Sequence, residues 1–134
     1  ILDTDAHKII YTRTIRTLPI ETLEERLYFT QAHIRQLFLT TTITRAAIET
    51  PYFGKYSTVL KVAMAYGACL CACVEAKVPV SHYSPACVKK NATGIGSADK
   101  LMVINAVQLM YGLEGLDSHM ADAVALAHVD QQFI

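Results

Sequence analysis

The sequence predicts a single α/β domain. Segments typical of strands and helices follow one another as strands, helix, strand, helix, strand and then helices. With 134 residues, of which 52% are hydrophobic and 18% charged, the chain is large and apolar enough to bury a core. It contains no internal repeat, linker or low-complexity tract, so we expect residues 1–134 to form one domain.

The first forty residues predict a hairpin followed by a helix. Residues 1–8 resemble a strand end and a turn, in which Asp3 and Asp5 are typical turn residues. Residues 8–17 are rich in Ile, Thr and Tyr, which favours a second strand. A helix then begins at Pro19 or Thr22 and ends near Leu39, with apolar side chains on one face.

A carboxylate directly follows the next predicted strand. The apolar segment 43–48 leads into Glu49, and Pro51 cannot continue a sheet because it lacks the backbone N–H. In open α/β sheets, ligands gather at the carboxyl ends of strands. Glu49 is therefore either a charged residue that marks a strand end or a functional side chain.

The middle of the chain predicts a long helix of small apolar residues. It begins with Ser57 as its cap and ends near Lys77. Because it is apolar nearly all round, we expect it to be buried on more than one side, against the sheet and another subunit. Its longest apolar run, 62–74, is shorter than a membrane span requires. No signal peptide is visible.

The four cysteines predict small buried thiols in a reducing compartment. The chain contains no C-x₂-C pair, the spacing that zinc sites favour. Three of the cysteines lie in the long helix at i, i+2 and i+4. The cysteines are Cys69, Cys71, Cys73 and Cys87.

The last third of the chain predicts a short strand and three helices. Residues 78–83 form the strand, and Ser84-Pro85 is a typical helix start. A glycine-containing loop at 91–97 separates this helix from the next, which ends near Tyr111. A final helix begins at Ser118 or His119 and ends near Val129.

Charge is distributed unevenly over this last third. The net charge of zero argues weakly against nucleic-acid binding. Between residues 77 and 100, however, there are four lysines and one acid, whereas residues 101–134 carry four acids and no Lys or Arg. Lysines for phosphates beside carboxylates for a metal are what a nuclease needs.

The pair His119 and Asp122 allows two interpretations. Its i, i+3 spacing places both side chains on one helix face near the helix start. In the first interpretation, Ser118 or Asp117 caps the helix and Asp122 has no chemical role. In the second, the pair binds a metal ion together with Glu49.

Taken together, these segments resemble the RuvC-type Holliday junction resolvases, nucleases of the ribonuclease H-like fold. The resemblance covers nearly the whole chain. Its most specific parts are the block Gly94-Ile95-Gly96-Ser97-Ala98-Asp99-Lys100 and the final helix with Ala121-Asp122-Ala123. It implies an α/β fold with a mixed sheet flanked by helices.

The resemblance also implies the site residues. Glu49, His119 and Asp122 match metal-binding positions of the family, where the position of His119 holds Asp or His. Lys89 and Lys100 match basic residues at the scissile phosphate, which makes all five residues candidates for catalysis. The positions expected to contact DNA are Tyr52, Phe53, Lys55, Lys89, Lys90 and Lys100.

The implied function is metal-dependent cutting of four-way DNA junctions with Mg²⁺ or Mn²⁺, in the cytoplasm or another reducing compartment that holds DNA. We expect a homodimer through the helix at 57–77 and no membrane association. The family's first strand with its essential aspartate is expected to precede Ile1, in preference to Asp5 acting as the ligand. The alternatives are a non-catalytic junction-binding protein and a ribonuclease H-like nuclease that acts on other branched DNA or RNA.

Overall fold

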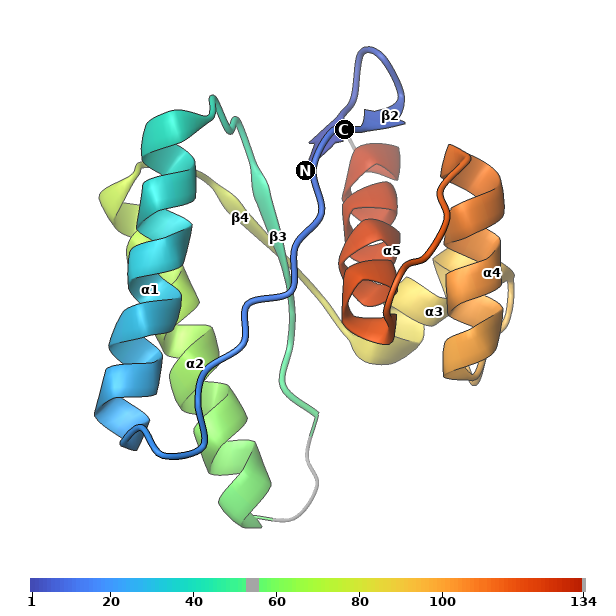
Figure 1. Ribbon diagram of the computed structural model, residues 1–134. Helices are drawn as coiled ribbons and strands as arrows, with labels where there is room; N and C mark the ends of the chain where they lie inside the picture. The colour runs from blue at the N-terminus through green and yellow to red at the C-terminus, as the bar shows by residue number, and fades with distance from the viewer. Residues whose placement is uncertain (53–55, 134) are drawn as a thin grey trace. The chain divides into compact units, whose positions relative to one another are not determined.

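Strands and helices alternate in the computed structural model, which describes residues 1–52 and 56–133 (Figure 1). The chain divides into two compact units. The first unit joins Ile1–Thr14 to Tyr83–Ile134, and the second is Ile15–His82. The single domain expected for residues 1–134 therefore stays a prediction.

The first unit combines a short hairpin with three helices. Its β-strands pair antiparallel, with Leu2 opposite Ile9, and Asp3 Oδ1 accepts the backbone N–H of Asp5 and of Ala6 in the turn. These bonds confirm the hairpin and the turn role of Asp3. The elements are β1 (Leu2–Asp3), β2 (Lys8–Ile9), α3 (Pro85–Thr93), α4 (Lys100–Tyr111) and α5 (Ser118–Gln132).

The second predicted strand is shorter than the sequence suggested. It ends at Ile9, so the expectation of a strand as far as Thr17 is wrong for residues 10–17. A strand needs a partner of matching length for its ladder of hydrogen bonds. In the described sheet that partner is β1, which has two residues.

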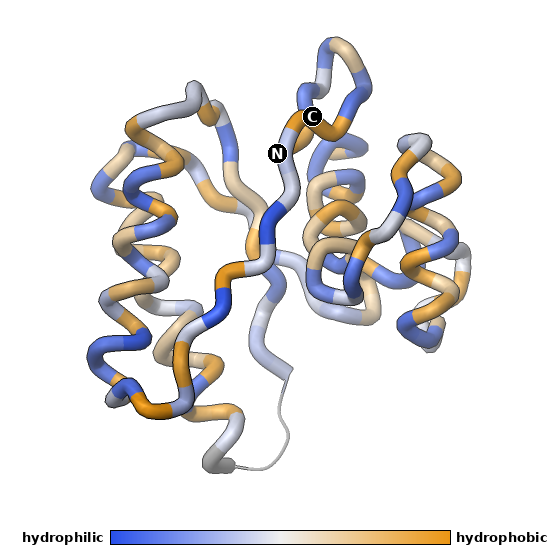
Figure 2. Tube along the Cα trace, viewed as in Figure 1, coloured by the Kyte–Doolittle hydropathy of each residue, from blue (hydrophilic) through white to orange (hydrophobic). Residues whose placement is uncertain are grey.

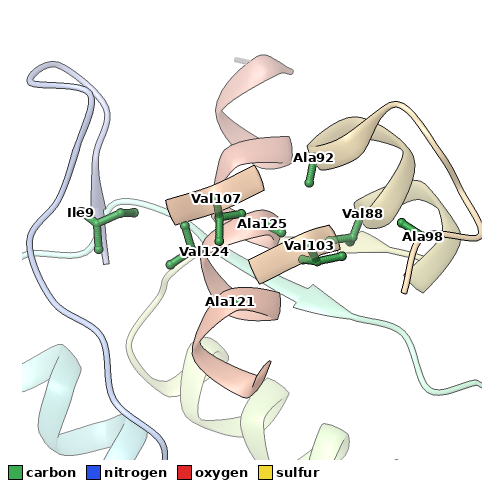
Figure 3. Packing of buried hydrophobic residues seen from close by; sticks show 9 residues of the cluster. All are labelled: Ile9, Val88, Ala92, Ala98, Val103, Val107, Ala121, Val124 and Ala125. Carbon is green, nitrogen blue, oxygen red and sulfur yellow. The ribbon is translucent and has the colours of Figure 1, made fainter. Parts of the chain in front are cut away.

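Small side chains form the core of the first unit. Valines and alanines from α3, α4 and α5 meet there, and Ile9 joins them from β2 (Figure 3). Such small residues let helix axes approach closely and pack at high density. The buried cluster consists of Ile9, Val88, Ala92, Ala98, Val103, Val107, Ala121, Val124 and Ala125.

Each of these three helices begins at a capping side chain. Ser84 caps α3, with Pro85 as the first helical residue, as predicted. Asp99 accepts the N–H of Met102 at the start of α4, and Asp117 does the same for Met120 at the start of α5. α3 continues to Thr93, well into the predicted loop, where Gly94 (φ 80°) ends it in the left-handed conformation.

The second unit packs two helices side by side beside paired strands. α1 begins with a reciprocal capping box, in which Thr22 Oγ1 accepts from Glu25 N and Glu25 Oε2 accepts from Thr22 N. Polar and apolar residues alternate around it (Figure 2). The elements are α1 (Leu23–Thr40), β3 (Ala46–Glu49), α2 (Tyr56–Glu75) and β4 (Val80–Tyr83), whose last residue belongs to the first unit.

Helix α2 is far more exposed than the sequence suggested. It begins at Tyr56, one residue before the expected cap Ser57, and only 11% of the window Thr58–Glu75 is buried. Ala72 and Cys73 are buried, but Cys71 is exposed, which corrects the expectation of four buried thiols. Burial on several sides is not found within the described single chain, and burial against another subunit stays a prediction.

The same helix is longer than the apolar run that the sequence analysis considered as a membrane span. By length and composition alone, the 18 residues Thr58–Glu75 suffice to cross a bilayer. The segment considered from the sequence, 62–74, left out Val59 and Leu60, which precede it in the helix. A single helix that meets this criterion is weak evidence for a span.

A neutral histidine links two helices of the first unit, and we expect it to make stability depend on pH. His128 Nδ1 lies 2.9 Å from Tyr111 Oη, and Gln132 Nε2 lies 2.8 Å from His128 Nε2. Burial, and to a lesser degree the charge of His7, lower the pKa of His128 below 6.5. The free energy of unfolding should therefore fall as pH drops from 6.5 towards the lowered value, because only the unfolded chain takes up the proton there.

Chemical denaturation at a series of pH values, compared with His128→Gln, tests this expectation. The variant should lose less stability between neutral and acidic pH than the unchanged protein. Equal losses in both proteins would contradict it.

Candidate active site

A half-buried carboxylate lies at the edge of the three-helix core. Asp122 occupies the second turn of α5, directly after Ala121, whose side chain is completely buried. Burial raises the pKa of Asp122, and the charges of Lys100, His119 and Lys89 oppose that rise, Lys100 most strongly. Three basic side chains thus favour the charged form of this half-buried carboxylate.

Each helix of the first unit contributes a side chain to the group of Asp122, His119, Lys89 and Lys100. The packing of the core fixes the positions of the three helices. Lys89 follows Val88, which is buried in α3, and Lys100 begins α4 two residues after the buried Ala98. A side chain next to a core residue on a helix lies at the rim of the core, because successive residues are 100° apart. The packing that buries Val88 and Ala98 thus fixes the backbone positions from which Lys89 and Lys100 act electrostatically on Asp122.

The cap expected in the first interpretation of the pair His119 and Asp122 is present. Asp117 is the N-cap of α5, with Oδ1 2.8 Å from Met120 N, so the helix start already has its acceptor. His119 is the second residue of the helix and is exposed, and it interacts electrostatically with Asp122. The structure thus brings together His119, Asp122, Lys89 and Lys100.

Glu49 belongs to the second unit, where it is the last residue of β3. The strand starts at Ala46, three residues later than expected, where the backbone N–H donates to Pro79 O at 2.9 Å. Arg45 Nη2 also donates to Ser81 Oγ at 3.1 Å. These bonds fix the strand whose end presents Glu49, and its side chain is exposed. The prediction of a carboxylate at a strand end is confirmed.

The predicted DNA-contacting residues are partly described. Tyr52 is 78% exposed shortly after β3, and Lys90 is exposed near the end of α3. Phe53 and Lys55 lie outside the described residues. An aromatic ring exposed to this degree contributes little to the fold and is available for contact with a partner.

The donor atoms fit a hard cation only in part. Within residues 1–52 and 56–133, no three His, Cys, Asp or Glu side chains form a group that could hold a metal ion. His119 and Asp122 form a pair, whereas Glu49 lies in the other unit. A divalent cation beside Asp122 would offset the burial that favours protonation of this carboxylate, so the pair fits one side of such a site.

The sequence analysis missed one contact at this site. Thr14 Oγ1 donates to Asp117 Oδ2 at 2.8 Å, across 103 positions of the chain. Asp117 carried a recognisable signal, because Asp is a favoured N-cap residue. Thr14 carried none, because a threonine in an extended segment is equally typical of a strand.

Comparisons with known proteins agree on one family. The family model described as crossover junction endodeoxyribonuclease RuvC matches residues 3–129. The protein of that name from Treponema denticola is 42% identical over 85 residues, which are 61% of this chain and 48% of the relative. The one from Brachyspira hyodysenteriae is 32% identical over 91% of this chain and 77% of the relative.

A solved structure is similar over the same range. Thermus thermophilus RuvC in complex with a Holliday junction substrate has a TM-score of 0.82 and 32% identity, covering 91% of this chain and 76% of the other. The α/β arrangement of five described helices and small sheets is thus the ribonuclease H-like fold of that protein, as predicted. Compared with the Treponema protein, this chain spans about half the length of its relative.

The interaction between Lys100 and Asp122 can be tested by titration. In Lys100→Met the pKa of Asp122 should rise further, because the strongest of the charges that stabilise the carboxylate is lost. Carbon-13 NMR of the side-chain carboxyl group measures this pKa. Lys90→Met is the matched control, since Lys90 is exposed in the same basic segment and is not among the charges that act on Asp122. An unchanged pKa in Lys100→Met would contradict the described geometry.

Proposed function

This chain belongs to the crossover junction endodeoxyribonuclease RuvC family, and we propose that it resolves four-way DNA junctions by metal-dependent hydrolysis of phosphodiester bonds. One observation carries the proposal: the charges of Lys100, His119 and Lys89 act on the half-buried carboxylate of Asp122. In such a group the cations can bind a phosphate, and the carboxylate beside them can bind a metal ion. The junction-bound Thermus structure supports branched DNA as the substrate.

Each residue of the candidate site would have the role that suits the chemistry of its side chain. Glu49, His119 and Asp122 would hold Mg²⁺ or Mn²⁺, which favour oxygen ligands. A bound divalent cation lowers the pKa of water and stabilises charge on phosphate oxygens. Lys89 and Lys100 would bind and orient the scissile phosphate. Alternatively to being a ligand, His119, exposed at the start of α5, would accept a proton from the attacking water or orient it.

Other exposed residues would contact the DNA beyond the cut. Tyr52 offers a ring for stacking on a base at the opened centre of a junction. Lys90 would bind a backbone phosphate beside Lys89. Phe53 and Lys55 are proposed for the same contacts from the sequence alone.

The reducing compartment that the cysteines suggest is consistent with this substrate. All four cysteines are free thiols, as is usual for proteins of the cytoplasm. We therefore infer that the protein acts where cells keep their DNA under reducing conditions.

A homodimer through α2 would supply two cutting sites for a symmetric junction. An apolar stripe runs along this helix at spacings of four and three residues, typical of helix pairing. Leu60, Met64 and Val74 in the stripe are 49%, 41% and 73% exposed. The α2 stripe consists of Leu60, Met64, Gly67, Cys71 and Val74.

The rival functions differ in simple assays. A non-catalytic junction-binding protein would bind a labelled four-way junction and leave it intact after Mg²⁺ or Mn²⁺ is added. A nuclease for other branched nucleic acids would cut flaps or RNA–DNA hybrids faster than four-way junctions. The proposed function requires paired cuts in the junction and little cutting of duplex.

Removing either proposed carboxylate ligand tests the mechanism. Glu49→Gln and Asp122→Asn, in the protein as the cell makes it, should each lower the cleavage rate by more than about 100-fold. Loss of an outer-shell partner already costs roughly 10- to 100-fold in metalloenzymes, and a ligand should cost more. Junction binding, measured by gel shift without metal, should survive. Glu114→Gln, an exposed carboxylate in the loop before α5, is the control. A near-normal rate would exclude the altered residue as a ligand.

Light scattering tests the α2 stripe. Met64→Arg places a charge in the stripe and should convert dimers to monomers. Val62→Arg is the matched control, because Val62 is equally apolar and 48% exposed but faces away from the stripe. If both variants keep the mass of the unchanged protein while folded, the interface lies elsewhere.

A further inference from the structure

The two oxygens of the Asp117 carboxylate accept from two different parts of the first unit. Oδ1 accepts the N–H of Met120 at 2.8 Å, which caps α5. Oδ2 accepts the hydroxyl of Thr14 at 2.8 Å. These bonds lower the pKa of Asp117, so the carboxylate is charged at neutral pH. Charge-assisted hydrogen bonds of this kind are short and strong.

The segment that carries Thr14 is itself anchored. Its upstream end pairs with the first strand, where Leu2 lies opposite Ile9 and Ile10 N donates to Ile1 O at 3.0 Å. Ile9 is buried in the core that also receives α3, α4 and α5. Thr14 therefore ties the start of α5 to a segment that the core already holds.

The first turn of a helix is where such a tie matters. Helix ends fray, and the hydrogen bond from Thr14 adds a second restraint to the one that the cap already gives the carboxylate. His119 is the second residue of α5, and Asp122 lies one turn further on. The backbone N–H of His119 also donates to the Asp117 carboxylate, and the His119 side chain interacts with it electrostatically, so a restraint on Asp117 acts on His119.

We propose that Thr14 is a positioning residue, which acts through Asp117 to orient His119 and Asp122 for metal binding and phosphodiester cleavage. This role rests on the proposed function. It differs from a merely structural role, in which loss of the Thr14 hydroxyl would lower stability and leave the properties of the folded site unchanged.

Four variants separate the two roles. Thr14→Val keeps the shape of the side chain but removes the hydroxyl, and Thr14→Ser restores the donor. Thr17→Val is the matched control, because Thr17 lies in the same extended segment but accepts from Arg26 Nε of α1, at 2.8 Å. Asp117→Ser keeps a good N-cap residue but removes the second oxygen that Thr14 needs.

Cleavage of a four-way junction at saturating DNA is the first measurement. Thr14→Val and Asp117→Ser should each lower kcat by about 10-fold, the low end of the cost of losing an outer-shell partner, while KM and junction affinity stay unchanged. Thr14→Ser and Thr17→Val should keep the normal kcat. The double variant should be no slower than either single one, because both changes break the same contact.

Amide hydrogen exchange at Met120 and Ala121 is the second measurement and needs neither metal nor activity. Exchange should be several-fold faster in Thr14→Val than in the unchanged protein or in Thr17→Val. Equal exchange rates, or a normal kcat in Thr14→Val, would overturn the inference. If the unchanged protein cuts no junction with Mg²⁺ or Mn²⁺, the proposed function fails, and the exchange rates alone decide whether Thr14 positions α5.

Discussion

The balance of charge around Asp122 is the constraint on which the candidate site depends. Burial at the edge of a helical core favours the neutral acid, whereas Lys100, His119 and Lys89 favour the carboxylate. Neither influence alone favours metal binding. A fully solvated carboxylate has no neighbouring groups that position it, and a fully buried one is protonated. Three helices must hold their register for this balance to exist, so the core of valine and alanine is part of the site.

A second carboxylate on α5, that of Asp130, is buried in different surroundings. Asp130 is only 7% exposed, and its Oδ1 accepts the hydroxyl of Tyr83 at 2.9 Å. A neutral donor meets the need of a buried acceptor and adds no charge that could attract a phosphate. Asp122, two turns earlier, has cationic neighbours and partial exposure instead. Surroundings, more than residue type, distinguish the carboxylate of the candidate site from the more deeply buried one.

Local signals in the sequence predicted most elements of the fold, and non-local contacts account for what was missed. Thr22 and the Ser84-Pro85 pair mark helix starts correctly, because a cap depends on neighbouring residues only. The strand expected over residues 8–17 ends at Ile9, since ladder length depends on the partner strand. The candidate pair His119 and Asp122 followed from helical spacing and family resemblance. The link from Thr14 to Asp117 spans 103 positions and has no local signature.

The exposure of α2 could not be predicted from the composition of this helix. Its small apolar residues indicate close packing, and composition alone cannot say whether the packing partner belongs to the same chain. Inside the second unit, α1 packs against α2, yet Ala72 and Cys73 are the buried residues of α2 among its described side chains. Water therefore contacts a stripe whose spacing of four and three residues matches helix pairing. Exposed apolar area of this kind is costly in water, which is the physical basis for the proposed pairing of the stripe with a second helix.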